Sequence, residues 1–310
     1  MTTVPILFAF DNKLVQPAGV CLSSLLENAG PDTFYDIFIL HDGDTVIDGR
    51  ILSLPEHYGN CRITERRVEN EFSGAYEIRG ITSPAYYRFL APELIPEYDK
   101  ILYSDVDVIF REDLSPYYLT DIGDNYFGAV DNCSSLRPDV RKYVSEELHL
   151  DYRKGFYYSG NLVINSRKIL EDGLIESFRA MSTKKYFQMD MDIMNIVCNG
   201  RIYPLPPSFC MTTFIYELIM GRREDMVRLY GEEEVVHTLK SGIVHYNGEK
   251  PWNGVCPNMD IWWDFYRKSI FFDEQFARDF WYGQSYRMEK LSLWKRIKLV
   301  GRYFRKGGRK

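Results

Sequence analysis

Asp105 and Asp107 are separated by a single residue and follow an apolar run at residues 101–103. Such a run predicts a buried strand, with the two carboxylates at its end. Carboxylates this close repel each other, which raises the pKa of one of them unless a cation lies between them. Magnesium and manganese prefer oxygen ligands and keep positions open for phosphate oxygens. The pair therefore indicates a metal clamp for a diphosphate, whereas a solvated turn is the commoner role of a bare Asp-x-Asp.

The segments around this pair alternate between strand-like and helix-like patterns. Strands are predicted at residues 5–10, 34–40, 61–68, 100–110, 126–130 and 156–165. Helices are predicted at residues 17–27, 45–54, 83–94, 138–148, 166–184, 190–198 and 262–266. This βαβα rhythm predicts an α/β fold with a largely parallel sheet and helices on both faces. Open sheets of this class bind ligands at the carboxyl ends of their strands, where Asp105 stands.

The composition is that of an ordinary globular protein, because 45% of the 310 residues are hydrophobic and 26% are charged. The cysteines form no Cys-x-x-Cys pair, which argues against a zinc site or a disulfide scaffold and for a reducing compartment. No signal peptide or apolar run of membrane-spanning length is evident, so we expect a cytoplasmic protein. We expect one domain at residues 1–270 and a helical, basic extension at residues 271–310.

The extension differs in charge from the rest of the chain. From Arg287 onward it holds ten Lys and Arg residues against one acid, although the whole chain has a net charge of −6. An apolar stripe recurs at helical spacing beside Trp294, at Leu293, Ile297, Val300 and Phe304. This pattern predicts an interfacial helix for anionic lipid, on the inner face of the plasma membrane. The alternative is a helix that packs on the body with a solvated basic face.

Five blocks in chain order, between Ile6 and Trp252, resemble glycosyltransferase family 8. They are residues 7–11, 83–89, 99–107, the pair 129–131 and 156–165 together with 189–195, and 245–252. The resemblance implies a GT-A fold, which is a Rossmann-like, mostly parallel central sheet with flanking helices. It also implies a retaining enzyme that uses a nucleotide-diphosphate sugar. The chain is most similar to the bacterial members, which build lipopolysaccharide and related surface glycans.

The resemblance assigns the nucleotide contacts to the first two blocks. Ala9 and Asp11 are expected to hold the uridine, because a carboxylate at a strand tip can accept the uracil imide N–H. Arg88 is expected to reach the nucleotide-sugar, where a guanidinium can neutralise phosphate or bond to a sugar. The alternative for Arg88 is a surface arginine beside core aromatic residues.

The metal and phosphate contacts follow from the third and fifth blocks. Asp105, Asp107 and His245 are expected to hold Mn²⁺ or Mg²⁺, because imidazole can complete the coordination of a borderline metal. Gly248 lets the backbone approach a pyrophosphate closely, and Lys250 can meet the phosphates as a point charge. A lone histidine is more often structural, but these neighbours favour a functional reading.

The sugar side departs from the family pattern at two positions. Tyr158 stands where the family commonly has asparagine, and Met191 stands where it has a glutamine discussed as a nucleophile. A thioether cannot replace an amide oxygen in that role. Asp190 and Asp131 are then the candidate catalytic residues, with a helix N-cap as the alternative for Asp190. Retention of the anomeric configuration without an obvious protein nucleophile suggests front-face attack by the acceptor hydroxyl.

The sequence thus predicts a retaining hexosyltransferase. It would move glucose or galactose from a UDP-sugar to a carbohydrate or glycolipid acceptor such as the lipopolysaccharide core, with no nucleic-acid partner. Two alternatives stay open. One is a phosphohydrolase of the haloacid-dehalogenase type, which also carries Asp-x-Asp after a strand. The other is a non-catalytic relative that binds UDP-sugar without turnover.

Overall fold

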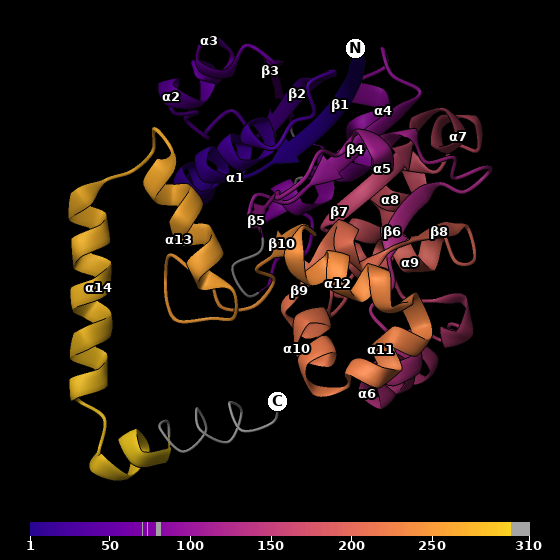
Figure 1. The fold of residues 1–310 in the computed structure, drawn as a ribbon. Helices are drawn as coiled ribbons and strands as arrows, with labels where there is room; N and C mark the ends of the chain where they lie inside the picture. The colour runs from indigo at the N-terminus through magenta and orange to yellow at the C-terminus, as the bar shows by residue number, and fades with distance from the viewer. Residues whose placement is uncertain (70, 73, 79–81, 299–310) are drawn as a thin grey trace. The chain divides into compact units, whose positions relative to one another are not determined.

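The computed structural model describes residues 1–69, 71–72, 74–78 and 82–298. The chain forms two compact units, Met1–Asn247 and Gly248–Lys310 (Figure 1). Among the described helices, none combines the length and the apolar composition needed to cross a bilayer.

A seven-stranded sheet forms the centre of the first unit, in the order β3-β2-β1-β4-β7-β6-β8. Its strands are β1 (Thr2–Ala9), β2 (Thr33–His41), β3 (Cys61–Arg67), β4 (Lys100–Ser104), β6 (Phe127–Val130), β7 (Asn161–Asn165) and β8 (Ile202–Leu205). Strand β7 runs antiparallel to β4 and β6, whereas the other neighbours pair in parallel. The predicted mostly parallel α/β sheet is confirmed.

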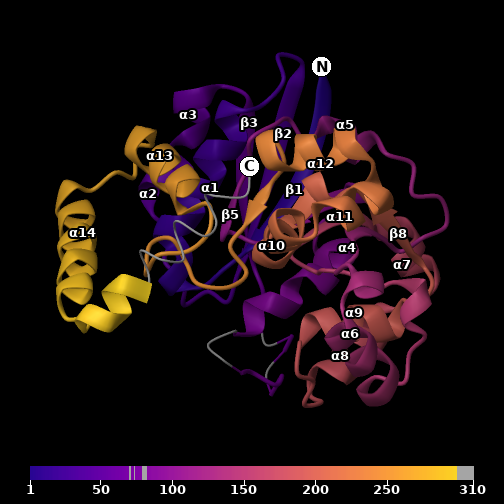
Figure 2. The ribbon, with the colours of Figure 1, turned by 60° about the horizontal axis from the view of Figure 1, so that its bottom comes forward.

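The central strands are apolar on both faces because both faces are covered. In β1 the last six residues are all buried, and β4 is buried from its second residue onward. Continuous apolar runs of this kind are typical of parallel sheets that lie between helical layers. Figures 1 and 2 show helices flanking the sheet. The carboxyl ends of β1 and β4 meet at one edge, because Phe8 pairs with Ser104.

The helices of the first unit are mostly short. The α-helices are α1 (Val15–Glu27), α2 (Gly49–Leu52), α3 (Leu54–Tyr58), α4 (Ala91–Leu94), α5 (Ser115–Leu119), α6 (Pro138–Lys142), α7 (Ser166–Glu171), α8 (Ile175–Ser182), α9 (Asp190–Val197), α10 (Thr213–Gly221), α11 (Arg223–Tyr230) and α12 (Glu232–Lys240). The 3₁₀ helices are η1 (Asn12–Leu14), η2 (Ser83–Leu90), η3 (Ser134–Leu136), η5 (Tyr152–Lys154) and η6 (Pro207–Cys210), and η4 (Tyr143–Glu147) is a π-helix.

A second sheet of three short strands lies beside the carboxyl end of β4. It consists of β5 (Val108–Ile109), β10 (Val244–His245) and β9 (Met211–Thr212), with β10 in the middle. In β10, His245 pairs with Val108 on one side and with Thr212 on the other. This sheet connects segments that are far apart in the sequence.

Several predicted elements differ from the observed ones. The strand expected at 100–110 is interrupted at residues 105–107, and the helix expected at 83–94 is a 3₁₀ turn, η2, followed by α4. The helix expected at 166–184 divides into α7 and α8 at Gly173, which has a φ of +66°. The elements from β8 to α12 lie in a stretch for which no element was predicted.

The second unit contains α13 (Met259–Lys268) and α14 (Glu274–Glu289), which pack through aromatic side chains. The ring centroid of Trp263 lies 4.6 Å from that of Phe280 and 5.4 Å from that of Trp281. The second compact unit begins at Gly248, earlier than the domain boundary that the sequence predicted at residue 270, and it includes α13. The division into a catalytic domain and an extension stays a prediction.

Candidate active site

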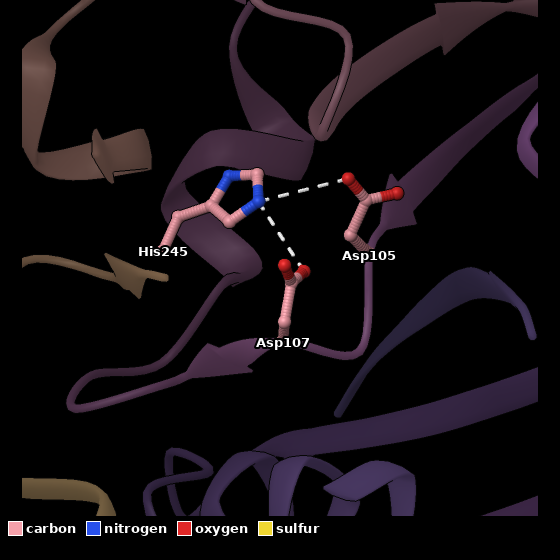
Figure 3. A group of neighbouring side chains, drawn as sticks. All are labelled: Asp105, Asp107 and His245. Atoms are coloured by element: carbon pink, nitrogen blue, oxygen red, sulfur yellow. Dashed lines mark ion pairs between the residues drawn. The ribbon is translucent and has the colours of Figure 1, made fainter. Parts of the chain in front are cut away.

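Asp105, Asp107 and His245 form a group of three ligand-type side chains (Figure 3). Their candidate ligand atoms all lie within 4.8 Å of one another. The Nε2 atom of His245 lies 3.3 Å from Asp107 Oδ1 and 3.7 Å from Asp105 Oδ2. Two carboxylates and one imidazole make a donor set that suits manganese or magnesium. The structure thus brings together the three residues predicted as metal ligands.

Backbone pairing places these side chains. Asp105 follows the last residue of β4, and its N–H donates to the carbonyl oxygen of Gly160 over 2.8 Å. The N–H of Tyr246 donates to the carbonyl oxygen of Asp107 over 2.9 Å. Asp107 directly precedes β5, whose Val108 pairs with His245, so the antiparallel pairing of β5 with β10 holds Asp107 beside His245.

Gly160 leaves the space that the group needs. A Cβ atom at this position would lie 2.8 Å from Asp105 Oδ2 and would overlap the ring of His245. Any side chain here would therefore displace a candidate ligand. Glycine is needed at this position because there is no room for a Cβ atom, and not because of its backbone conformation.

His245 is buried, and its ring has a polar neighbour at each nitrogen. Burial alone would lower its pKa, but the carboxylate of Asp107 outweighs burial and holds the pKa well above the ordinary value. The Nδ1 atom lies 3.4 Å from the sulfur of Cys210. A metal ion bound at Nε2 would replace the proton there, because a histidine ligand binds in its neutral form.

The other oxygen of Asp105 is held by two buried donors. Oδ1 accepts hydrogen bonds from the Tyr103 hydroxyl over 2.7 Å and from Arg88 Nη2 over 2.9 Å. The guanidinium of Arg88 lies 4.2 Å above the centre of the Tyr103 ring. Burial raises the pKa of Tyr103 well above its ordinary value, so its hydroxyl remains a donor. Tyr103 was not predicted as a site residue, because in the sequence it is one more apolar residue of the strand.

Arg88 lies between two carboxylates rather than at the surface. Only 3% of its side chain is exposed, and its Nη1 lies 3.3 Å from Asp190 Oδ2. Nη1 also donates to the carbonyl oxygen of Ser159, and Nε donates to that of Ala85 over 2.7 Å. Burial raises the pKa of Asp190, and the charge of Arg88 opposes this rise. The structure rules out the exposed arginine of the alternative reading.

The backbone is strained just before Asp190. Met189 has a φ of 51° and a ψ of −120°, and its side chain is fully buried. A non-glycine residue in such a region carries a conformational cost, and these residues gather at functional sites. Met189 itself is the N-cap position of α9, so Asp190 belongs to the first helical turn instead. This position directs the Asp190 carboxylate toward Arg88.

Asp131 follows β6 and is bonded to backbone groups. Oδ1 accepts from the N–H of Ser134 over 2.9 Å, and Oδ2 accepts from the N–H of Phe156 over 2.8 Å. Burial raises its pKa. Nearby, the hydroxyl of Tyr158 donates to Asn132 Oδ1 over 2.5 Å. These bonds give Asp131 a role in fixing the loop, and its catalytic role stays a prediction.

The two predicted uridine contacts lie at the end of β1. Ala9 is the last residue of that strand and follows Phe8, the partner of Ser104. Asp11 accepts from the N–H of Lys13 over 2.9 Å and from the Thr82 hydroxyl over 3.1 Å. Ala9 therefore lies at the same sheet edge as Asp105. Gly248 and Lys250 belong to the second unit, and their phosphate contacts stay predictions.

The model of the family described as "Glycosyl transferase family 8" matches residues 5–256. The chain belongs to glycosyltransferase family 8. Membership of this family contradicts the phosphohydrolase alternative.

Curated relatives agree with this assignment. This family 8 chain is 24% identical to the glycosyltransferase GlyF of Streptococcus pneumoniae, over 83% of the chain and 60% of the relative. It is 26% identical to the lipopolysaccharide 1,2-glucosyltransferase of Escherichia coli K12, over 79% of the chain and 72% of the relative. The chain therefore spans less than two thirds of the length of GlyF.

Solved structures confirm the GT-A fold. An active-site mutant of LgtC superposes with a TM-score of 0.71 at 22% identity, covering 88% of this chain and 99% of that one. An LgtC complex with donor and acceptor sugar analogs gives 0.66 at 23% identity, with the same coverage. The bifunctional glycosyltransferase WbbM gives 0.69 at 21% identity, covering 92% of this chain and 52% of WbbM.

Proposed function

We propose that this family 8 protein is a retaining hexosyltransferase. It moves glucose or galactose from a UDP-sugar to a surface-glycan acceptor such as the lipopolysaccharide core. The observation that carries the proposal is the convergence of Asp105, Asp107 and His245 beside the end of β1. The E. coli relative named as a lipopolysaccharide glucosyltransferase supports the acceptor class. The LgtC structure that holds donor and acceptor sugar analogs supports a two-substrate site.

Asp105, Asp107 and His245 would hold Mn²⁺ or Mg²⁺. The donor set fits such an ion, and the glycine at position 160 keeps the space in front of the histidine open. The bound ion would supply Lewis-acid neutralisation of the charge that develops on the departing UDP. Ala9 and Asp11 would hold the uridine, and Gly248 and Lys250 would meet the phosphates.

Arg88 and Asp190 act on the sugar side of this site. Arg88 keeps one oxygen of Asp105 directed away from His245, which leaves Oδ2 on the side of the imidazole. Asp190 is held by the same guanidinium and supplies a negative charge toward the transferred sugar. Anomeric bond cleavage develops positive charge, as it does in glycoside hydrolysis, and a carboxylate stabilises that charge.

Retention in this protein proceeds by front-face attack. Met191 has no oxygen that can attack the anomeric carbon, Asp131 accepts from two backbone N–H groups, and Asp190 is paired with the guanidinium of Arg88. The acceptor hydroxyl then attacks from the side of the leaving group, and a phosphate oxygen of the departing UDP takes its proton.

Met191 and Tyr158 also favour a second candidate, a relative that binds UDP-sugar without turnover. The hydroxyl of Tyr158 is already bonded to Asn132. One experiment separates the two candidates: a panel of UDP-sugars is incubated with the protein and a glycan acceptor, with and without Mn²⁺, and released UDP is measured. UDP release that requires Mn²⁺ supports the enzyme. Calorimetric binding without UDP release supports the binding protein.

The basic extension would place the enzyme at an anionic membrane surface, on the cytoplasmic side. Leu293, Trp294 and Ile297 are 71%, 74% and 51% exposed, respectively. Val300 and Phe304, the rest of the predicted stripe, lie outside the described residues. Basic residues near such a surface contribute about 1 kcal/mol each and are screened by salt.

A truncation tests this placement. Deleting residues from Arg287 onward should release the protein from anionic vesicles in a flotation assay. UDP binding should not change, because the family match ends at residue 256. Full-length protein should also dissociate as salt rises. Equal flotation of the two forms would show that the extension does not bind lipid.

A further inference from the structure

A buried thiol lies directly behind the imidazole of the metal group. Cys210 is fully buried, and its sulfur lies 3.4 Å from His245 Nδ1. The opposite nitrogen, Nε2, faces Asp107 and Asp105. The ring is therefore held between two carboxylates on one side and one sulfur on the other.

The backbone holds this sulfur in place. Cys210 ends the turn η6 and directly precedes β9, whose Thr212 pairs with His245. The N–H of Met211 donates to the carbonyl oxygen of Ile243 over 2.8 Å, and the N–H of Ile243 donates to that of Ser208 over 2.7 Å. The pairing of β5, β10 and β9 thus places the carboxylate of Asp107, the imidazole of His245 and the thiol of Cys210 next to one another.

We propose that Cys210 is a positioning residue that orients His245 for metal binding. The inference rests on the proposed metal site. For Nε2 to present its lone pair to a cation, the ring proton must sit on Nδ1, where the sulfur of Cys210 accepts it. Metal-bound histidines usually donate their second N–H to an acceptor, which fixes the tautomer and the ring orientation. Here a buried thiol takes the place of the more common carboxylate or carbonyl oxygen.

The substitution Cys210→Ala removes the acceptor and tests this role. We expect Mn²⁺ affinity to fall roughly 10- to 100-fold, which is the usual effect of losing such an outer partner. Free Mn²⁺ is counted by electron paramagnetic resonance at graded protein concentrations. Cys210→Ser, whose hydroxyl can still accept the N–H, should restore most of the affinity. Cys198→Ala is the matched control, because Cys198 is an equally buried thiol at the end of α9.

A spectroscopic readout separates positioning from a general loss of packing. Pulsed electron paramagnetic resonance of bound Mn²⁺ detects the imidazole nitrogen directly. We expect this nitrogen signal in the native protein and in Cys210→Ser, and a weakened signal in Cys210→Ala. If Cys210 acts through His245, the double variant Cys210→Ala/His245→Ala should bind Mn²⁺ as His245→Ala does.

The outcomes distinguish this inference from the proposed function. Native protein that binds no Mn²⁺ would overturn the metal site and the inference together. Native binding, with equal affinity and an equal nitrogen signal in Cys210→Ala, would overturn the inference alone. Equal losses in Cys210→Ala and Cys198→Ala would also overturn it, because a packing defect would then explain both.

Discussion

Two groups of charged side chains in the first unit differ in how the negative charge of their carboxylates is balanced. Asp105 and Asp107 converge on the imidazole of His245, whose positive charge depends on a proton. Asp190 instead lies against Arg88, whose guanidinium is always charged. A group that depends on a removable proton can exchange that proton for a metal ion. A group balanced by a permanent cation remains assembled whether or not a metal is present.

Asp105 belongs to both groups, and this shared position couples them. One of its oxygens accepts from Arg88 and Tyr103, while the other lies on the side of His245. The permanent ion pair therefore orients a ligand of the exchangeable site. Substitutions at Asp107 or His245 should mainly weaken metal binding. Substitution of Arg88 should mainly lower the free energy of unfolding.

The largest expected effect is on metal binding in Asp107→Ala. Removing a ligand carboxylate should cost more than the roughly 10- to 100-fold that outer partners cost, so Mn²⁺-dependent UDP binding should become undetectable by calorimetry. Circular dichroism should show an unchanged fold. Native-like UDP affinity of Asp107→Ala in the presence of Mn²⁺ would show that Asp107 is not a metal ligand.

The second-largest effect concerns the free energy of unfolding, which should depend more on Arg88 than on Asp107. Arg88→Met leaves the buried carboxylate of Asp190 without its cation, so the free energy of unfolding should fall by about 3–5 kcal/mol in urea denaturation. The matched control is Asp107→Asn in metal-free protein. It removes the carboxylate that stabilises protonated His245, and since the imidazole can then lose its proton, the unfolding free energy should fall less than in Arg88→Met. A larger loss in Asp107→Asn than in Arg88→Met would invert the comparison.

A third substitution acts on the metal group through sterics alone. In Gly160→Ala, the new methyl group would meet Asp105 Oδ2 and the ring of His245, so the ligands must move apart. Mn²⁺ affinity should fall, and because the methyl group overpacks a buried ring, the unfolding free energy should fall by about 1–3 kcal/mol, less than in Arg88→Met. Unchanged Mn²⁺ affinity would show that the site tolerates a wider separation of its ligands.

The sequence was sufficient for the parallel sheet and for the metal group. Apolar runs identify buried strands, and Asp105 and Asp107 stand next to one of them, so local pattern predicted these two carboxylates. His245 was predicted only from the resemblance to the family. It was not sufficient for the elements between β8 and α12, because short helices and two-residue strands give little periodic signal. The role of Cys210 was not predicted either, because its contact with His245 depends on the pairing of two of these short strands, β9 and β10.

The surroundings of Arg88 also could not be predicted from local pattern. The η2 turn contains two tyrosines and a phenylalanine beside the arginine, which fits a surface position as well as a buried one. Its partners Asp105 and Asp190 come from segments far along the chain. Tertiary contacts therefore decided its position, and the strained Met189 before Asp190 had no signal in the sequence.

The smallest expected effect is on turnover in Met191→Ala. If the front-face mechanism holds, the thioether takes no part in bond formation, so kcat should stay within about tenfold of native. Asp190→Asn removes a charge toward the transferred sugar and should lower kcat roughly 100-fold or more, as the loss of one charge-stabilising group does. Both variants are assayed for UDP release under the same conditions. A glycosyl adduct on Asp190 or Asp131, trapped and located by mass spectrometry, would replace front-face attack with double displacement. The ion pair with Arg88 would then hold the nucleophile itself.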